Sequence, residues 1–360
     1  MGHRRDRAAR HPPAAAAPPR RRLVLPPRVR LPPLPKGLEP PAPGSWVWTC
    51  RAGAEGQLFE ELAWGRAVPV LLAAGLVSSR PLSGPPPAFA RTGFPVAGVA
   101  TTPAEALALL PREPLKVQVW SADTPAGNAL SRECAAWQVA LEAARPGGPD
   151  TPWKAFEAGA WLGQVCLAAP GLGLVGAVRA REALSLAAGG RARQVRSGAA
   201  PSRAAMKLDE ALDWYGVAPG KGETCADLGS APGGWTRRLL DRGARVLSVD
   251  TGQLAPDLAA HPRVRHVTSS AFAFEPEAPV DWVFCDMAWR PLEVAQLLGK
   301  WARKGWAGQL VANFKLPMKD RLPVVVELRG LLEDAGWRQV RVKQLYHDRD
   351  EVTVTARAAG

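Results

Sequence analysis

The sequence predicts an α/β protein in which a doubly wound, mostly parallel sheet follows a smaller α+β unit. Three observations support this fold class. From residue 202 onward, short apolar runs typical of buried strands alternate with amphipathic helical patterns. After the first run comes the glycine-rich turn 229–234, of the kind that brings backbone close to a nucleotide-like ligand. The length of 360 residues is also sufficient for two domains.

In the second half, hydrophobic periodicity predicts strands, helices and a closing hairpin. The strands are expected at 224–228, 245–249, 264–267, 280–285 and 309–313, and the helices at 204–214, 234–242, 291–304 and 322–335. Two more strand-like runs, 339–346 and 351–357, flank the turn-rich residues 347–350 and predict an antiparallel hairpin. Ligands of such open sheets bind beyond the carboxyl ends of the strands.

The first unit is expected over residues 46–173. Residues 46–50 and 115–120 alternate like strands, whereas 56–63 and 129–144 have helical spacing. This mixture predicts a small α+β unit.

Two basic segments flank that unit. Residues 1–45 hold ten Lys or Arg against two acids, with repeated Pro pairs, and are expected to be a disordered tail. The tail either binds RNA or is a dispensable extension. Residues 174–201 are expected to be a linker, and the second unit covers 202–360. An arginine stripe near the linker either follows an RNA backbone or is solvated: Arg179, Arg181, Arg191, Arg193, Arg196 and Arg203.

Composition narrows the class of protein. The longest apolar run, 68–77, is far shorter than the ~20 residues of a membrane helix, so no membrane association is expected. Five scattered cysteines without a Cys-x-x-Cys pair indicate neither a disulfide framework nor a zinc site. We therefore expect a soluble, monomeric, cytoplasmic protein without a bound metal.

The glycine-rich turn supplies the first site candidates, Gly229, Pro232, Gly233 and Gly234. A dinucleotide fingerprint would need glycine where this chain has Ala231. About 20 residues later, the next predicted strand is followed by Asp250, whose carboxylate can accept hydrogen bonds from ribose hydroxyls. Turn and acid together favour an adenosine ligand, and the alternative is an ordinary strand-to-helix turn.

Four polar residues are expected near the carboxyl ends of the strands, where ligands of this fold bind. Asp286 and Lys315 each follow a predicted strand, Glu351 begins the last strand, and Lys207 lies on the helix that opens the second unit. Taken singly, each is explained as a solvated residue. Together, two lysines and two carboxylates are expected to converge beside the adenosine site.

Several motifs occur in an order that resembles a known family. They are Ser202-Arg203-Ala204-Ala205-Met206-Lys207, the glycine-rich turn, Cys285-Asp286-Met287, Asn313-Phe314-Lys315-Leu316-Pro317, and Tyr346-His347-Asp348-Arg349-Asp350-Glu351. The pattern resembles the ribosomal RNA large-subunit methyltransferase M family, cytidine 2′-O-methyltransferases of 23S rRNA, and more broadly the FtsJ-like ribose methyltransferases. The resemblance is dense over 202–357 and looser over 46–173, where Cys50-Arg51-Ala52-Gly53 is similar to the start of that family's THUMP-type RNA-binding region.

The resemblance implies a Rossmann-like catalytic domain that uses S-adenosylmethionine. It implies a catalytic tetrad of Lys207, Asp286, Lys315 and Glu351, with Lys315 as the general base. It also implies cofactor contacts at Ser202, Gly229, Ala231, Pro232, Gly233, Gly234, Asp250, Ser270 and Asp286. Ser270 departs from the family, which usually has an acidic residue there. The implied partner is ribosomal RNA, either 23S rRNA or a large-subunit precursor.

Other functions compete with this interpretation. A dehydrogenase is opposed by Ala231, and an amino-methyltransferase would show Asn/Asp-Pro-Pro-Tyr/Phe where this chain has Asp286-Met287-Ala288-Trp289. A cytosine carbon-5 methyltransferase needs a nucleophilic cysteine, for which Cys285 is the candidate. A non-catalytic protein that binds RNA or S-adenosylmethionine would not need the two lysines and two carboxylates.

Overall fold

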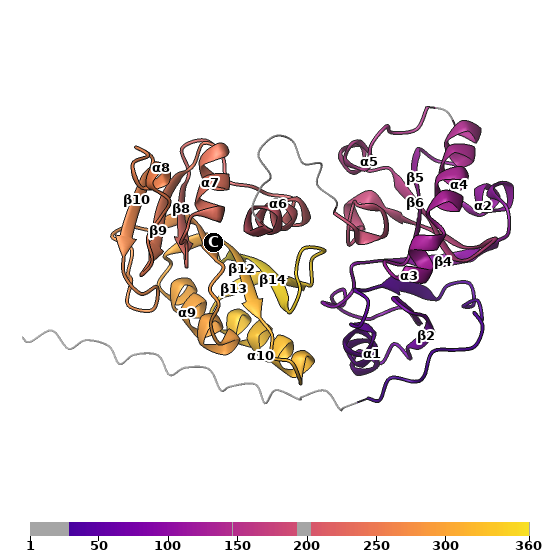
Figure 1. Cartoon of the computed structure of the whole chain (residues 1–360), viewed down its shortest axis with the longest axis horizontal. Coiled ribbons are helices and arrows are strands. Elements are labelled where there is room, and N and C mark those ends of the chain that lie inside the picture. The colour runs from indigo at the N-terminus through magenta and orange to yellow at the C-terminus, as the bar shows by residue number, and fades with distance from the viewer. Residues whose placement is uncertain (1–28, 146, 193–202, 360) are drawn as a thin grey trace, which may run out of the picture.

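The computed structural model describes residues 29–145, 147–192 and 203–359. These residues form two units, each built around a seven-stranded sheet. The two units lie side by side, with the N-terminal unit in indigo to magenta and the C-terminal unit in orange to yellow (Figure 1).

The N-terminal unit has a mixed sheet with strand order β2-β3-β1-β4-β7-β6-β5, in which only the described pair β5–β6 is parallel. Its strands are β1 (Trp46–Thr49), β2 (Val70–Ala73), β3 (Leu76–Ser79), β4 (Thr92–Ala100), β5 (Leu115–Ser121), β6 (Trp161–Ala169) and β7 (Leu172–Arg179). Its helices are α1 (Glu55–Trp64), α2 (Pro103–Leu109), α3 (Pro125–Ala129), α4 (Ser131–Ala144) and α5 (Pro152–Ala158).

Three of these helices begin in the same way, with a threonine followed by proline. The Thr102 side chain accepts a hydrogen bond from Glu105 N, Thr124 from Gly127 N and Thr151 from Lys154 N. Threonine satisfies one free N–H of the first turn, and proline at the first helical position has no N–H to leave unpaired. The sequence thus fixes the starts of α2, α3 and α5.

The predicted boundary between unit and linker at 173/174 lies inside β7 and is therefore wrong. Three arginines of the expected basic stripe, Arg179, Arg181 and Arg191, instead pack on the N-terminal unit. Arg179 pairs with Glu113 and lies over the Trp161 ring. Arg181 donates to the carbonyls of residues 156 and 157, and Arg191 to Ser121 O. Of the predicted linker, residues 193–201 lie outside the described residues, and so do Arg193 and Arg196 of the stripe.

The predicted disordered tail also differs from the structure in the part that is described. Val29 and Leu31 pack against the main apolar core, and Gly44 N donates to Val96 O at 2.8 Å. Val96 N in turn donates to Ser45 O at 2.8 Å. Backbone pairing with β4 therefore orders the end of this proline-rich segment, and residues 1–28 lie outside the described part of the chain.

The C-terminal unit has strand order β10-β9-β8-β11-β12-β14-β13. The first five strands are parallel, and β14 pairs antiparallel with both neighbours, which confirms the predicted parallel sheet and closing hairpin. The strands are β8 (Thr224–Leu228), β9 (Arg245–Asp250), β10 (Val264–Thr268), β11 (Val280–Cys285), β12 (Ala307–Lys315), β13 (Trp337–Lys343) and β14 (Glu351–Ala358). The helices are α6 (Arg203–Tyr215), α7 (Gly234–Asp241), α8 (Pro256–Ala259), α9 (Pro291–Arg303) and α10 (Arg321–Asp334).

Alternation along the strands assigns each side chain to one face of this sheet. On β11, Trp282 and Phe284 pack with residues of α6 and α7, whereas Val283 and Cys285 pack with residues of α9 and α10. Both faces are covered, and the parallel strands are accordingly apolar on both sides.

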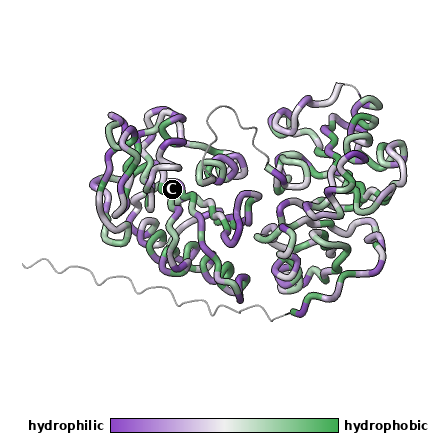
Figure 2. Tube along the Cα trace, in the orientation of Figure 1, coloured by the Kyte–Doolittle hydropathy of each residue, from purple (hydrophilic) through white to green (hydrophobic). Residues whose placement is uncertain are grey.

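The two units meet at the loop 344–350, which connects β13 to β14. This loop is mostly hydrophilic (Figure 2) and points toward the N-terminal unit (Figure 1). Gln344 N donates to Ala88 O at 2.6 Å, and the Arg91 guanidinium lies 4.8 Å from the centre of the Tyr346 ring. The N-terminal unit therefore contacts the chain a few residues before Glu351.

Candidate active site

The glycine-rich turn 229–234 connects β8 to α7 at the carboxyl end of the parallel strands. Gly229 and Gly233 have φ of +79° and +115°, values that residues with a side chain rarely adopt. A Cβ added at Gly229 would lie 2.5 Å from Met287 Cγ, and one at Gly233 would lie 2.2 Å from Leu258 Cδ1. Backbone conformation and packing therefore both require glycine at these two positions.

Asp250, at the end of β9, holds the turn in place. Its Oδ2 accepts a hydrogen bond from Ala231 N at 3.0 Å, and its Oδ1 accepts one from Gly252 N at 2.7 Å. The sequence predicts that this carboxylate receives ribose hydroxyls, and each oxygen keeps a second lone pair for such a donor.

Asp227, on β8, lies beside the turn and is absent from the residues predicted from the sequence. Its side chain is buried, and Thr236 Oγ1 donates to Oδ2 at 2.7 Å. Burial, with a smaller effect of the Asp286 and Asp250 charges, raises the pKa of Asp227 to about 7. The signal in the sequence was an acidic residue inside an otherwise apolar strand.

Ser230, inside the turn, has a buried hydroxyl without a hydrogen-bond partner among the described residues. A buried hydroxyl normally has a partner, so this one is available to a bound ligand. With the carboxylates of Asp250 and Asp286, the available groups fit a ligand that carries hydroxyls, as an adenosine does. Ser270 Oγ accepts from Phe272 N at 3.3 Å, and Ser202 lies outside the described residues.

Two lysines converge on one carboxylate beside this turn. Lys315 and Glu351 are register partners on β12 and β14, and Lys315 Nζ donates to Glu351 Oε1. Lys207, on α6, donates from its Nζ to Glu351 Oε2. Residues far apart in the sequence thus form a Lys–Glu–Lys bridge on the face of the sheet that α6 covers.

The two lysines differ in their access to solvent. The Lys207 side chain is 10% exposed and that of Glu351 is 6%, whereas the Lys315 side chain is 47% exposed. Burial would raise the pKa of Glu351, but hydrogen bonds and charge from both lysines outweigh it and hold that pKa below its usual value. Lys315 is therefore the member of the bridge that a substrate can reach.

Asp286 lies between the glycine-rich turn and the strand that carries Lys315, and among the described residues its side chain accepts a hydrogen bond from Asn313 rather than from either lysine. Its backbone N donates to Leu228 O at 3.3 Å, directly before Gly229, and its Oδ1 accepts from Asn313 Nδ2 at 3.2 Å. Asn313 lies two residues before Lys315 on β12, so their side chains share one face of the sheet. The structure thus places Asp286 between the turn and the strand that carries Lys315.

An exposed aromatic pair follows the carboxyl ends of β10 and β11. Phe272 is 38% exposed and Trp289 is 52% exposed, and their ring centres are 5.8 Å apart. Exposed aromatic rings in contact are suited to stacking on a nucleobase. Trp289 lies three residues after Asp286, and neither ring was predicted as a site residue.

The larger of two described cavities lies between the two units, with a volume of about 880 Å³. Its lining includes Trp153 and Phe156 of α5, whose rings stack at 5.3 Å, and Trp214 of α6, over which lies the guanidinium of Arg341. Glu210, one helical turn after Lys207, also lines it. The cavity therefore extends from α6 and β13 to the N-terminal unit, and the three residues of the lysine bridge do not line it.

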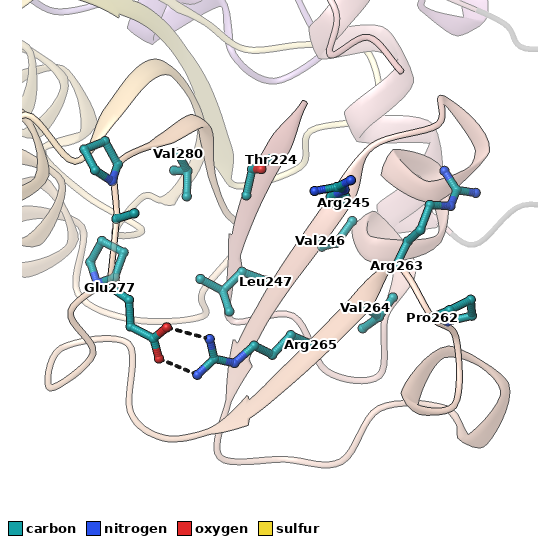
Figure 3. A pocket seen from close by; sticks show the side chains of 13 residues that line it. Thr224, Arg245, Val246, Leu247, Pro262, Arg263, Val264, Arg265, Glu277 and Val280 are labelled. Carbon is teal, nitrogen blue, oxygen red and sulfur yellow. Dashed lines mark hydrogen bonds and ion pairs between the residues drawn. The ribbon is translucent and has the colours of Figure 1, made fainter. Parts of the chain in front are cut away.

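A smaller hollow of about 380 Å³ lies at the amino ends of the parallel strands (Figure 3). Thr224, Arg245, Val264 and Val280, which begin their strands, line it, and Arg265 pairs with Glu277 across it. It is thus remote from the carboxyl ends of the strands where the turn and the lysines lie.

Cys285 is fully buried on the face of the sheet that α9 and α10 cover, opposite the lysine bridge. Burial raises the pKa of its thiol to about 12. A nucleophilic cysteine must be accessible and readily ionised, and Cys285 is neither.

The described residues contain neither a cluster of metal ligands nor a helix that could cross a membrane. Within ranges 29–145, 147–192 and 203–359, no three His, Cys, Asp or Glu side chains lie together as metal ligands. Among the described helices, none has the length and apolar character to cross a membrane.

Comparisons with known proteins identify the family of this chain. The FtsJ-like methyltransferase family matches residues 200–298. The ribosomal RNA large subunit methyltransferase M of Alkalilimnicola ehrlichii is 36% identical over 86% of this chain and 94% of its own. The enzyme of the same name from Halorhodospira halophila is 45% identical over 44% of this chain and 47% of its own. An identity of 36% across nearly the whole length of both chains is decisive: this chain belongs to the ribosomal RNA large subunit methyltransferase M family.

Proposed function

We propose that the protein transfers a methyl group from S-adenosylmethionine to the ribose 2′-hydroxyl of a cytidine in 23S ribosomal RNA. The observation that carries the proposal is the convergence of Lys207 and Lys315 on Glu351, beside Asp286 and at the carboxyl ends of the strands. Membership of a ribosomal RNA methyltransferase family supports the choice of substrate.

The residues that would hold the cofactor surround the glycine-rich turn. Gly229 and Gly233 fix the turn, Ala231 N binds Asp250, and the buried Ser230 hydroxyl is available. Pro232, Gly234 and Ser270 complete the set proposed for the adenosine and methionine portions. The bound cofactor supplies a methyl group already activated by its sulfonium, so the protein's task lies on the hydroxyl side.

A ribose hydroxyl is a weak acid, and its proton must leave as the oxygen attacks. Lys315 is the exposed lysine of the bridge and is proposed as the general base that accepts this proton. Lys207 is buried and shares Glu351 with it, so it would hold the carboxylate in position. A positioned base typically contributes about 10²–10⁴ in rate.

The N-terminal unit is proposed to hold the RNA, with the cavity between the units as part of its path. Aromatic rings that stack on bases and arginines that neutralise phosphates are typical of surfaces for unpaired RNA. Trp153, Trp214 and Arg341 supply both kinds of group close to α6.

The test is the substitution Lys315→Ala, compared with Lys304→Ala, which changes an exposed lysine at the end of α9. We expect Lys315→Ala to abolish methyl transfer to ribosomal RNA while S-adenosylmethionine binding stays close to that of the wild type. Lys304→Ala should keep both properties. Turnover at the wild-type rate in Lys315→Ala would rule out this lysine as the base.

The position of the new methyl group tests the reaction itself. Mass spectrometry of nucleosides from wild-type product should find the methyl group on the ribose of a cytidine. A methyl group on carbon 5 of the base would contradict the proposal and would require a nucleophile other than the buried Cys285.

A further inference from the structure

A second cross-strand pair lies next to Lys315 and Glu351. Asn313 of β12 and Thr353 of β14 are register partners, two residues from the first pair on the same face of the sheet. Thr353 Oγ1 is 2.8 Å from Asn313 Oδ1 and 3.1 Å from Asp348 Oδ2. The Asn313 amide nitrogen donates to Asp286 Oδ1 at 3.2 Å.

Counting protons fixes the direction of these hydrogen bonds. The NH₂ group of Asn313 donates to Asp286, so the amide oxygen, which can only accept, faces Thr353. Thr353 then donates its single hydroxyl proton to Asn313. Its other contact, with Asp348, is a hydrogen bond only if the Asp348 carboxyl carries a proton and donates it.

The surroundings of Asp348 favour that protonated carboxyl. The side chain is buried, and its Oδ1 has no hydrogen-bond partner in the described part of the chain. Burial, together with the charges of Glu210 and Glu351 and against that of Lys207, raises the pKa of Asp348 to about 8. The buried side chain of Lys343 also lies near the Asp348 carboxyl. Because Oδ1 has no partner in the described part of the chain, a negative charge on this buried carboxyl would be uncompensated. A neutral carboxyl avoids that cost.

We propose that Asp348 and Thr353 are positioning residues for Asp286. Asp348 donates to Thr353, and Thr353 donates to Asn313. The Asn313 amide, fixed in this way, holds the Asp286 carboxylate between the glycine-rich turn and Lys315. The inference rests on the proposed methyl transfer and adds residues that touch neither cofactor nor ribose.

The N-terminal unit takes part in this arrangement through the loop that carries Asp348. Gln344 N donates to Ala88 O, and the next amide, Leu345 N, donates to Asp348 Oδ2 at 2.9 Å. Arg51 of the N-terminal unit donates to Arg349 O, directly after Asp348. The position of Asp348 is thus set by contacts from both units.

The experiment compares Thr353→Val with Thr355→Val in the full-length protein. Both threonines are fully buried on the same face of β14, but Thr355 Oγ1 has no hydrogen-bond partner among the described residues. Valine keeps the shape and removes the hydroxyl. We expect Thr353→Val to lower kcat about 10- to 100-fold, as a small misplacement of a reacting group does. The KM for RNA should not change.

Two further variants separate positioning from a loss of folding. Thr353→Ser retains the hydroxyl and should restore most of kcat, whereas Thr355→Val should match the wild type. In an Asn313→Ala background, Thr353→Val should add no further loss, because its effect passes through Asn313. Additive losses, or wild-type kcat in Thr353→Val, would overturn the inference.

Should Thr353→Val not fold, Asp348→Asn decides the question. In the proposed arrangement Asp348 Oδ2, which accepts from Leu345 N, also donates to Thr353 Oγ1, and neither atom of an amide does both. We expect the same fall in kcat, and unchanged kcat would contradict the proposal. Failure of the proposed function is recognised separately, because the wild-type protein itself would then place no methyl group on ribose.

Discussion

Glu351 accepts hydrogen bonds from Lys315 and Lys207 through its two different carboxylate oxygens. One lysine comes from the neighbouring strand and the other from α6, so a single buried carboxylate joins the sheet to the helix above it. The direction of both lysine side chains depends on this one residue, because each donates to one of its oxygens.

The substitution Glu351→Gln tests that dependence. It preserves shape but replaces one acceptor oxygen with an NH₂ group, which cannot accept from a lysine, so the bridge loses a hydrogen bond and Lys315 loses its fixed direction. We expect kcat to fall at least about 100-fold with little change in cofactor affinity. Single-turnover methyl transfer measures this, with Glu327→Gln on the exposed side of α10 as the matched control. A fall of equal size in the control would show that the effect is not local.

Gly229→Ala should weaken both folding and cofactor binding. An alanine at φ +79° costs about 1–2 kcal/mol, and its Cβ would collide with Met287 Cγ. Gly222→Ala is the control, because Gly222 has φ +88° with nothing within 4 Å of the added Cβ. Isothermal titration with S-adenosylmethionine and thermal unfolding should show affinity loss in Gly229→Ala alone, with a smaller stability loss in the control. Equal cofactor affinities would contradict a role for this turn in binding.

Asp227→Asn should change how stability depends on pH. The folded-state pKa of about 7 is above the usual value, so the favourable contribution of Asp227 is complete below about pH 4 and is lost as pH rises through 7. Asparagine retains the bond from Thr236 without ionising. We therefore expect the unfolding temperature of the variant, relative to that of the wild type, to be higher at pH 8.5 than at pH 5.5. An equal difference in unfolding temperature between variant and wild type at both pH values would contradict the prediction. Asp334→Asn on α10 is the control for a general change in charge.

Trp153→Ala should weaken RNA binding without affecting the cofactor. Its ring is 47% exposed, stacks on Phe156 and lines the cavity between the units. Stacking on a base contributes about 1–3 kcal/mol, so we expect RNA to bind roughly tenfold more weakly or worse. Trp64→Ala on α1, which removes a 37% exposed ring outside the cavity lining, should bind RNA normally. Filter binding at fixed salt measures both, and equal affinities would exclude the cavity from the RNA path.

The sequence predicted the C-terminal unit well because its strands are apolar and bounded by clear turns. The expected strands 224–228 and 280–285 match β8 and β11 in the structure. It predicted the N-terminal unit less fully. Strands β4, β6 and β7 are rich in glycine and alanine and lack clear alternation, so periodicity does not reveal them. The Thr-Pro starts of α2, α3 and α5 were a usable signal that hydrophobic periodicity alone does not contain.

The sequence predicts site residues where a polar side chain stands at the carboxyl end of an apolar strand, as Asp286 and Lys315 do. Thr353 and Asp348 were not predictable in the same way, because their role depends on a cross-strand register and on a loop held by the other unit. The ionisation of Asp348 likewise depends on burial, which no local pattern of residues records.

The loop 344–350 is held by main-chain carbonyls of the N-terminal unit: Ala88 O accepts from Gln344 N, and Leu184 O accepts from Lys343 Nζ. Every amino acid has the same carbonyl group, so these acceptors survive almost any substitution at positions 88 and 184. Insertion or deletion of a residue nearby would displace them and, with them, the loop that precedes Glu351. During evolution, we therefore expect the lengths of these two segments to stay constant, while the buried Ala88 and Leu184 are limited to apolar residues that fit the core.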